Sequence, residues 1–177
     1  MFFLFAHFVG CIAMALYIFS YQIRNNRSMI VCRMLGDLIY MVHYLMLGSY
    51  SGCVTLIVCA LSGLVYSCKG HSWAEWRGWK WFFCGLLIVS CLFVWRTDFD
   101  PLPCICTLIS ILTVILTTWS GKSTINRLGK LLSAGPAWLI YCISVGSPSG
   151  AIAELIGMGS AALGLYRYGL KEQPDPS

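Results

Sequence analysis

The feature that most constrains the fold is the stretch from Leu38 to Cys68, thirty-one residues without an Asp, Glu, Lys or Arg. A helix crosses a bilayer with about 20 apolar residues, so this stretch is too long for a single crossing. Turn-forming residues interrupt it at Gly48–Gly52, with the sequence GSYSG. The stretch therefore predicts two membrane-spanning helices joined by a tight turn.

Composition places the whole chain in a membrane. The chain is 58% hydrophobic and 11% charged, whereas soluble domains carry about 25% charged residues. We expect an integral membrane protein in a lipid bilayer, with one domain at 1–170 and a disordered cytoplasmic tail at 171–177. The start of the chain lacks the basic segment of a cleaved signal peptide, so we expect it to remain as the first membrane pass.

Charge and cysteine content exclude several partners. The net charge of +5 is spread over short loops, so we exclude a nucleic-acid partner. Most of the ten cysteines fall in apolar runs, where cysteine behaves as a small hydrophobic residue. The close pair Cys104 and Cys106 has no neighbouring histidines, so we expect no metal and no cofactor.

Seven membrane passes fit the apolar runs, at about 2–23, 28–47, 52–68, 81–95, 101–119, 128–145 and 149–168. Each is close to the length that a bilayer requires. We expect helices because the backbone in lipid must satisfy its own hydrogen bonds. The second pass must contain Asp37, because only ten residues separate Asp37 from Gly48. This places Asp37 close to the middle of the membrane, with Arg33 one turn nearer the interface.

Basic residues set the predicted orientation. When successive loops are assigned alternately to the two sides, one side receives eleven basic residues and the other receives only Arg96. The eleven are Arg24, Arg27, Arg33, Lys69, Arg77, Lys80, Lys122, Arg127, Lys130, Arg167 and Lys171. Because basic residues favour the cytoplasm, we expect the N-terminus outside and the C-terminus inside.

The turn sequence recurs. Gly146–Gly150, GSPSG, lies ninety-eight positions after GSYSG and matches four of its five residues. The same offset aligns Tyr40 with Trp138 and His43 with Tyr141. We expect two parallel three-helix repeats, at 2–68 and 100–168, joined by a linker helix at 78–96. Parallel repeats occur in SWEET transporters, and transporters built from repeats bind substrate near the midplane, between the repeats.

Three segments carry a family resemblance: Val42–Tyr50, the Asn25-Asn26-Arg27 loop and Gly146–Glu154. They resemble the YgjV-type family of bacterial inner-membrane proteins, which looks related to the MtN3/SWEET-like superfamily of three-helix-repeat transporters. The resemblance covers about residues 8–169 and implies a 3+1+3 helix arrangement, an inner-membrane location and translocation of an unnamed substrate. SWEET proteins also carry prolines in several bundle helices and asparagines in passes three and seven. This chain has Leu38 where the repeat would place a second proline, and no such asparagine, so no sugar-binding residue is carried over.

Charged groups inside a membrane identify the candidate site. A charge at the bilayer centre costs about 2.5–3.5 kcal/mol, and such residues face the bundle interior or a cavity. The candidate cavity residues are Arg33, Asp37, Tyr40, His43, Trp138, Tyr141 and Glu154. Arg33 and Asp37 can pair at i,i+4 spacing, which would either neutralise the pair or leave Asp37 to bind a ligand. His43 is either a hydrogen-bonded core residue or a proton switch, and Glu154 either gates the outer mouth or lies in a hydrated vestibule.

These features favour a transporter or facilitator for a small polar or amphipathic solute, with a cavity between the repeats. One alternative is a non-transporting structural or partner-binding helix bundle, because few polar residues are available to line a path. A second is an intramembrane enzyme acting on a lipid. Gly121-Lys122-Ser123 lacks the upstream glycine of a phosphate-binding loop, and neither a catalytic triad nor paired carboxylates can be argued. We therefore expect no enzymatic activity. Formation of a homo-oligomer is possible on these features.

Overall fold

The structure is a computed structural model that describes residues 2–98 and 101–168. The tail expected at 171–177 lies outside these residues. Within the described ranges every regular element is a helix. The helices are α1 (Phe2–Ser20), α2 (Asn26–Met46), α3 (Tyr50–Ser67), η1 (Ser72–Glu75), α4 (Trp79–Asp98), α5 (Pro101–Thr118), α6 (Ser123–Gly129), η2 (Lys130–Ala134), α7 (Gly135–Ser144) and α8 (Pro148–Tyr168).

The long helices correspond to the seven predicted passes. α6, η2 and α7 follow one another without a break and form one rod from Ser123 to Ser144. Its start is the main difference from the sequence prediction, which placed the sixth pass at about Leu128. Gly121 adopts a left-handed backbone conformation (φ 77°), which ends the preceding helix, and the chain re-enters a helix two residues later. The earlier start brings Arg127 into the rod.

The two GSxSG turns have the same backbone structure. Gly48 and Gly146 both adopt positive φ angles, 73° and 66°, which glycine tolerates because it has no Cβ. The N–H of the following serine then bonds back to a carbonyl five residues earlier, at 2.9 Å in the first turn and 2.8 Å in the second. This pattern is typical of a helix end with glycine in the left-handed conformation. It ends α2 and α7 alike.

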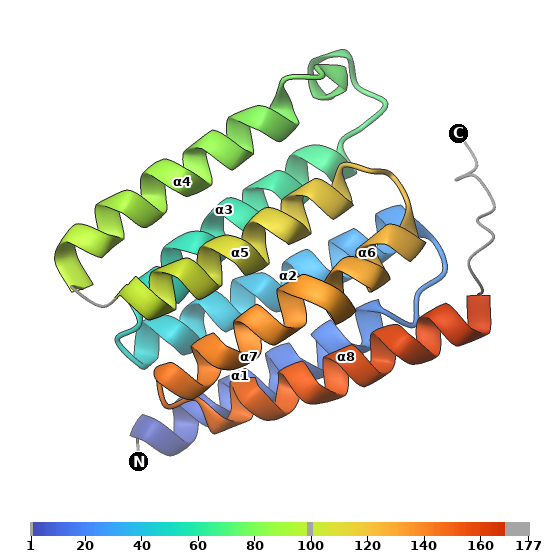
Figure 1. The fold of residues 1–177 in the computed structure, drawn as a ribbon. Coiled ribbons are helices and arrows are strands. Elements are labelled where there is room, and N and C mark those ends of the chain that lie inside the picture. The colour runs from blue at the N-terminus through green and yellow to red at the C-terminus, as the bar shows by residue number, and fades with distance from the viewer. Residues whose placement is uncertain (1, 99–100, 169–177) are drawn as a thin grey trace.

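The helices lie side by side in one bundle (Figure 1). α2 packs against α1 and α3, and the rod containing α7 packs against α5 and α8. Contacts of α1 with α8 and of α3 with α5 join these two groups, and α4 packs outside them against α3 and α5. The centre of the bundle is therefore enclosed by α1, α2, α3, α5, α7 and α8.

The connections lie at two opposite ends of the bundle (Figure 1). The segments 21–25, 68–78 and 119–122 lie at one end, called the 21–25 end below, and the two GSxSG turns lie at the other. Among the described helices, α2, α3 and α5 are long and apolar enough to cross a membrane, and α1 and α4 contain shorter apolar segments at Phe5–Ser20 and Trp79–Trp95. Many large apolar side chains are exposed, including Leu132, Ile143 and Phe93. A membrane accommodates such a surface, whereas water does not.

Candidate functional site

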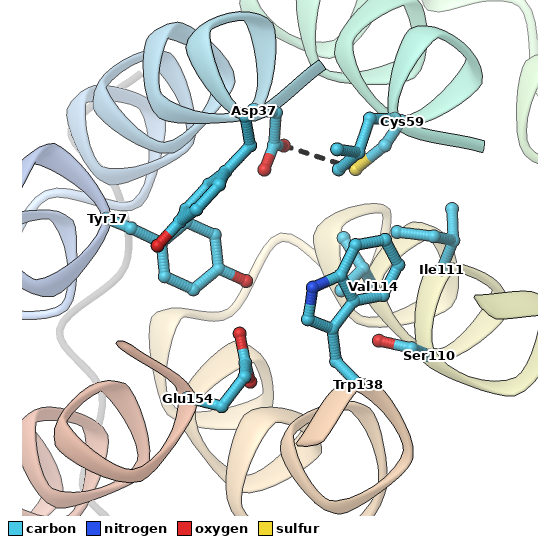
Figure 2. A pocket seen from close by; sticks show the side chains of 10 residues that line it. Tyr17, Asp37, Cys59, Ser110, Ile111, Val114, Trp138 and Glu154 are labelled. Atoms are coloured by element: carbon cyan, nitrogen blue, oxygen red, sulfur yellow. Dashed lines mark hydrogen bonds between the residues drawn. The ribbon is translucent and has the colours of Figure 1, made fainter. Parts of the chain in front are cut away.

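A small cavity lies inside the bundle, where six helices face one another (Figure 2). The residues that line it are Tyr17, Asp37, Tyr40, Leu56, Cys59, Ser110, Ile111, Val114, Trp138 and Glu154. The space open to the centre of a water molecule is about 20 Å³. One water requires roughly 10–15 Å³ by this measure, so the cavity has room for one or two water molecules.

Asp37 faces the cavity from α2 and is 4% exposed. Its Oδ2 accepts a hydrogen bond from the Cys59 thiol at 3.3 Å, which Figure 2 shows as a dashed line. Arg33 does not form the expected ion pair with Asp37 among the described residues. Its Nη2 donates to Thr118 Oγ1 at 2.6 Å, and its Nη1 donates to Asn126 Oδ1 at 3.5 Å. Helix side chains point back toward the N-terminus of their helix, so Arg33 extends away from Asp37, toward α5 and α6.

Glu154, one of the candidate cavity residues, lies on the cavity wall opposite Asp37 (Figure 2). It forms a buried ion pair with Lys130, and the two side chains are 5% and 2% exposed. The Lys130 Nζ also lies 4.7 Å from the centre of the Tyr17 ring. Lys130 was expected on the cytoplasmic side. Its pairing with Glu154 holds it in the bundle interior instead.

The rod changes its helical pitch beside this ion pair. Residues Lys130–Ala134 form a π-helical segment, and the N–H of Gly135 bonds to the carbonyl of Lys130. Pro136 has no N–H to donate, and the hydroxyl of Ser110 donates to the carbonyl of Ala134 at 2.9 Å. Single-turn π segments within α-helices are frequent at functional sites. Here the segment begins at Lys130 and ends four residues before Trp138, and both of these side chains face the bundle interior.

An aromatic cluster closes one side of the cavity. Tyr40 and Trp138 line the cavity, and Tyr44 packs against both. Trp138 Nε1 donates to the Tyr44 hydroxyl at 3.2 Å, and that hydroxyl lies 3.1 Å from the Cys142 sulfur. Sequence reasoning missed Tyr44. The repeat offset, which aligns Tyr44 with Cys142, was the signal that could have found it.

His43 and Tyr141 do not line the cavity but close the bundle at the end with the two GSxSG turns. His43 Nδ1 lies 2.7 Å from the carbonyl of Ala6. A carbonyl can only accept, so Nδ1 carries the hydrogen, and in the neutral ring Nε2 accepts from the Ser147 hydroxyl at 3.1 Å. In the corresponding bond, the Tyr141 hydroxyl lies 2.7 Å from the Ser49 hydroxyl. His43 is thus a hydrogen-bonded core residue that links the two halves of the chain.

A second polar network closes the 21–25 end of the bundle. Asn126 donates to Asn26 at 3.0 Å, and Asn26 donates to the Tyr66 hydroxyl at 3.0 Å. Arg127 is 1% exposed and donates to the backbone carbonyls of Tyr21 and Ile23. In the sequence analysis Arg127 contributed only as a cytoplasmic charge. No spacing pattern indicated the contact between Asn26 and Asn126. Hydrogen-bonded networks thus lie at both ends of the bundle.

Comparison with known families gives one clear result. The model of the Imp-YgjV family, described as a bacterial inner membrane protein, matches residues 4–172. The searches of curated proteins and of solved structures gave no match. Over the described part of the chain, no three or more His, Cys, Asp or Glu side chains gather as metal ligands would.

Proposed function

The chain belongs to the Imp-YgjV family of bacterial inner membrane proteins, and from this premise we propose that it is a small-solute transporter or facilitator. The observation that carries the proposal is the central cavity, which Asp37 faces without a salt bridge to any described residue. A carboxylate inside a membrane is costly and defaults to a functional role. The solute site of the proposal is this cavity, and catalysis is not part of it.

The proposed architecture is two parallel three-helix repeats, α1–α3 and α5–α8, joined by α4. Three features support it. The GSxSG turns carry the same hydrogen bonds, and the bond between His43 and Ser147 has its counterpart, ninety-eight positions apart, in the bond between Tyr141 and Ser49. The packing of α1 on α8 likewise corresponds to that of α5 on α3. These pairs would be exchanged by a two-fold axis along the membrane normal, the symmetry of parallel-repeat transporters.

In the proposed mechanism the cavity opens alternately to the two sides of the membrane. Opening at the GSxSG end would break the His43–Ser147 and Tyr141–Ser49 bonds, and opening at the opposite end would break the network around Asn26 and Asn126. Basic residues that are not buried, such as Arg27 and Lys122, lie at this second end. We therefore propose that it is cytoplasmic, with the N-terminus outside and the C-terminus inside.

A second candidate function is a non-transporting structural or partner-binding bundle. The observation that favours it is the size of the cavity, which holds one or two water molecules in the closed state. A single labelling experiment separates the two functions. Cysteines introduced along α2 and the α6–α7 rod would be tested in native membranes with a water-soluble thiol reagent.

A solute path predicts labelling at inward positions such as Tyr40 and Trp138. Leu38 and Ile140 are matched controls on the same helices, because their side chains point out of the bundle and are 41% and 49% exposed. In a membrane these two face lipid and should stay unlabelled. A continuous labelled inward stripe supports transport, whereas an unlabelled interior identifies a packed bundle.

A further inference from the structure

We propose that the central cavity binds a protonated primary amine no larger than methylammonium, held between the carboxylate of Asp37 and the hydroxyl of Tyr40. This inference rests on the proposed function, because it assigns a solute class to the same site. It follows from the hydrogen-bonding groups that face the cavity, from the aromatic walls and from the size of the space.

The charges around the cavity are unevenly paired. Glu154 has Lys130 as its ionic partner. The guanidinium of Arg33 bonds to Thr118 and Asn126 instead of to Asp37. Arg33 and Lys130 act on Asp37 only from a longer range. In the described structure the hydrogen-bond partner of Asp37 is the thiol of Cys59, a weak donor. A buried carboxylate requires a cationic or strongly donating partner, and a guest in the cavity would supply it.

The hydroxyl of Tyr40 is the second group that awaits a partner. The side chain lines the cavity and is 6% exposed, and its hydroxyl forms no hydrogen bond to any described residue. Tyr40 follows Asp37 by three positions on α2, so the two side chains lie on one face of the helix. An ammonium group has three N–H donors and no acceptor. It can donate to the Asp37 carboxylate and to the Tyr40 oxygen together.

The walls and the neighbouring ion pair fit the same chemistry. Aromatic rings attract ammonium groups through their negative faces, and Tyr17 and Trp138 form two walls of the cavity (Figure 2). The chain already holds one ammonium in this way, because Lys130 pairs with Glu154 and lies over the Tyr17 ring. The Asp37 side of the cavity offers a second carboxylate and a second tyrosine without a built-in lysine.

Size and polarity restrict the guest further. The space of about 20 Å³ admits one or two water-sized groups, which fits ammonium or methylammonium and is too small for tetramethylammonium. An anion would need several donors. Among the groups that face the cavity, the two carboxylates can only accept, and the hydroxyl hydrogen of Ser110 is directed to the carbonyl of Ala134.

The test is equilibrium binding of radiolabelled methylammonium to the purified full chain in lipid nanodiscs. We expect saturable binding that ammonium displaces and that tetramethylammonium or sodium at equal concentration does not. Asp37→Asn should weaken binding by about tenfold or more, as expected for the loss of a charge-assisted hydrogen bond. Tyr40→Phe should weaken it several-fold while leaving the thermal midpoint unchanged or higher, because the removed hydroxyl has no protein partner. Tyr50→Phe is the matched control, since Tyr50 is 57% exposed.

The outcomes separate this inference from the proposed function. No saturable methylammonium binding, or binding that Tyr40→Phe leaves unaltered, would overturn the amine assignment. Tyr40→Phe keeps the test decisive if Asp37→Asn fails to fold. Binding in nanodiscs requires no translocation, so binding without uptake into proteoliposomes supports the amine site and overturns transport. Labelling of the inward stripe without amine binding supports transport and overturns the amine site.

Discussion

Breaking the ion pair between Lys130 and Glu154 should be among the most destabilising changes in this protein. Both side chains are at least 95% buried and face each other inside the bundle. Replacing one member, by Lys130→Met or by Glu154→Gln, leaves the other charge buried without its partner. The loss of a single partner in such a pair costs about 3–5 kcal/mol. We expect a loss of this size in the free energy of unfolding for each single variant.

The double variant, Lys130→Met with Glu154→Gln, tests the reasoning behind that magnitude. It removes both charges, so no uncompensated charge remains, and we expect it to be more stable than either single variant. The double-mutant cycle should then give a coupling energy above about 2 kcal/mol. Reversible unfolding in mixed micelles by increasing SDS measures all four proteins. Lys122→Met, at an exposed position, is the control and should change stability by less than about 0.5 kcal/mol. If the loss of stability in the double variant equals the sum of the losses in the two single variants, the ion pair is refuted.

Three further changes test other parts of the structure. Gly52→Ala should cost about 1–3 kcal/mol, because a Cβ there would clash with the Tyr141 hydroxyl. Gly85→Ala in α4 meets nothing within 4 Å and should be neutral or stabilising by up to about 1 kcal/mol, because alanine favours a helix more than glycine does. SDS unfolding that ranks the two variants equally would contradict the close approach at Gly52. His43→Phe removes both hydrogen bonds of the imidazole and should cost about 1–3 kcal/mol while raising thiol labelling from the periplasmic side; unchanged labelling would show that His43 does not close that end. A reporter fused after Leu170 should be active only in its cytoplasmic form, and a periplasmic signal would reject the orientation.

The helices could be predicted from the sequence because each depends on local features. Apolar runs of bilayer length give the helices, and glycines at Gly48 and Gly146 end two of them. Part of the cavity lining was also predictable, since polar groups in apolar helices face the interior. This part comprises Asp37, Tyr40, Trp138 and Glu154.

The partners of these groups were not predictable, because they depend on neighbouring helices. Arg33 bonds to α5 and α6 instead of to its own helix neighbour Asp37. Lys130 pairs with Glu154 on another helix, α8, and Tyr44 had no feature that set it apart from the other residues of its apolar run. Interhelical contacts of this kind leave no periodic signal in a single sequence.

The most direct test of the central claim uses Cys59, which lines the cavity and bonds to Asp37. The central claim is that this cavity opens to both sides of the membrane in turn. A variant that keeps Cys59 as its sole cysteine would be exposed to a small impermeant thiol reagent in right-side-out and in inverted membrane vesicles. Alternating access predicts that Cys59 reacts in both preparations, although it is 5% exposed in the closed state. Reaction in neither preparation or in one alone, with full reaction after unfolding in SDS, would contradict the claim.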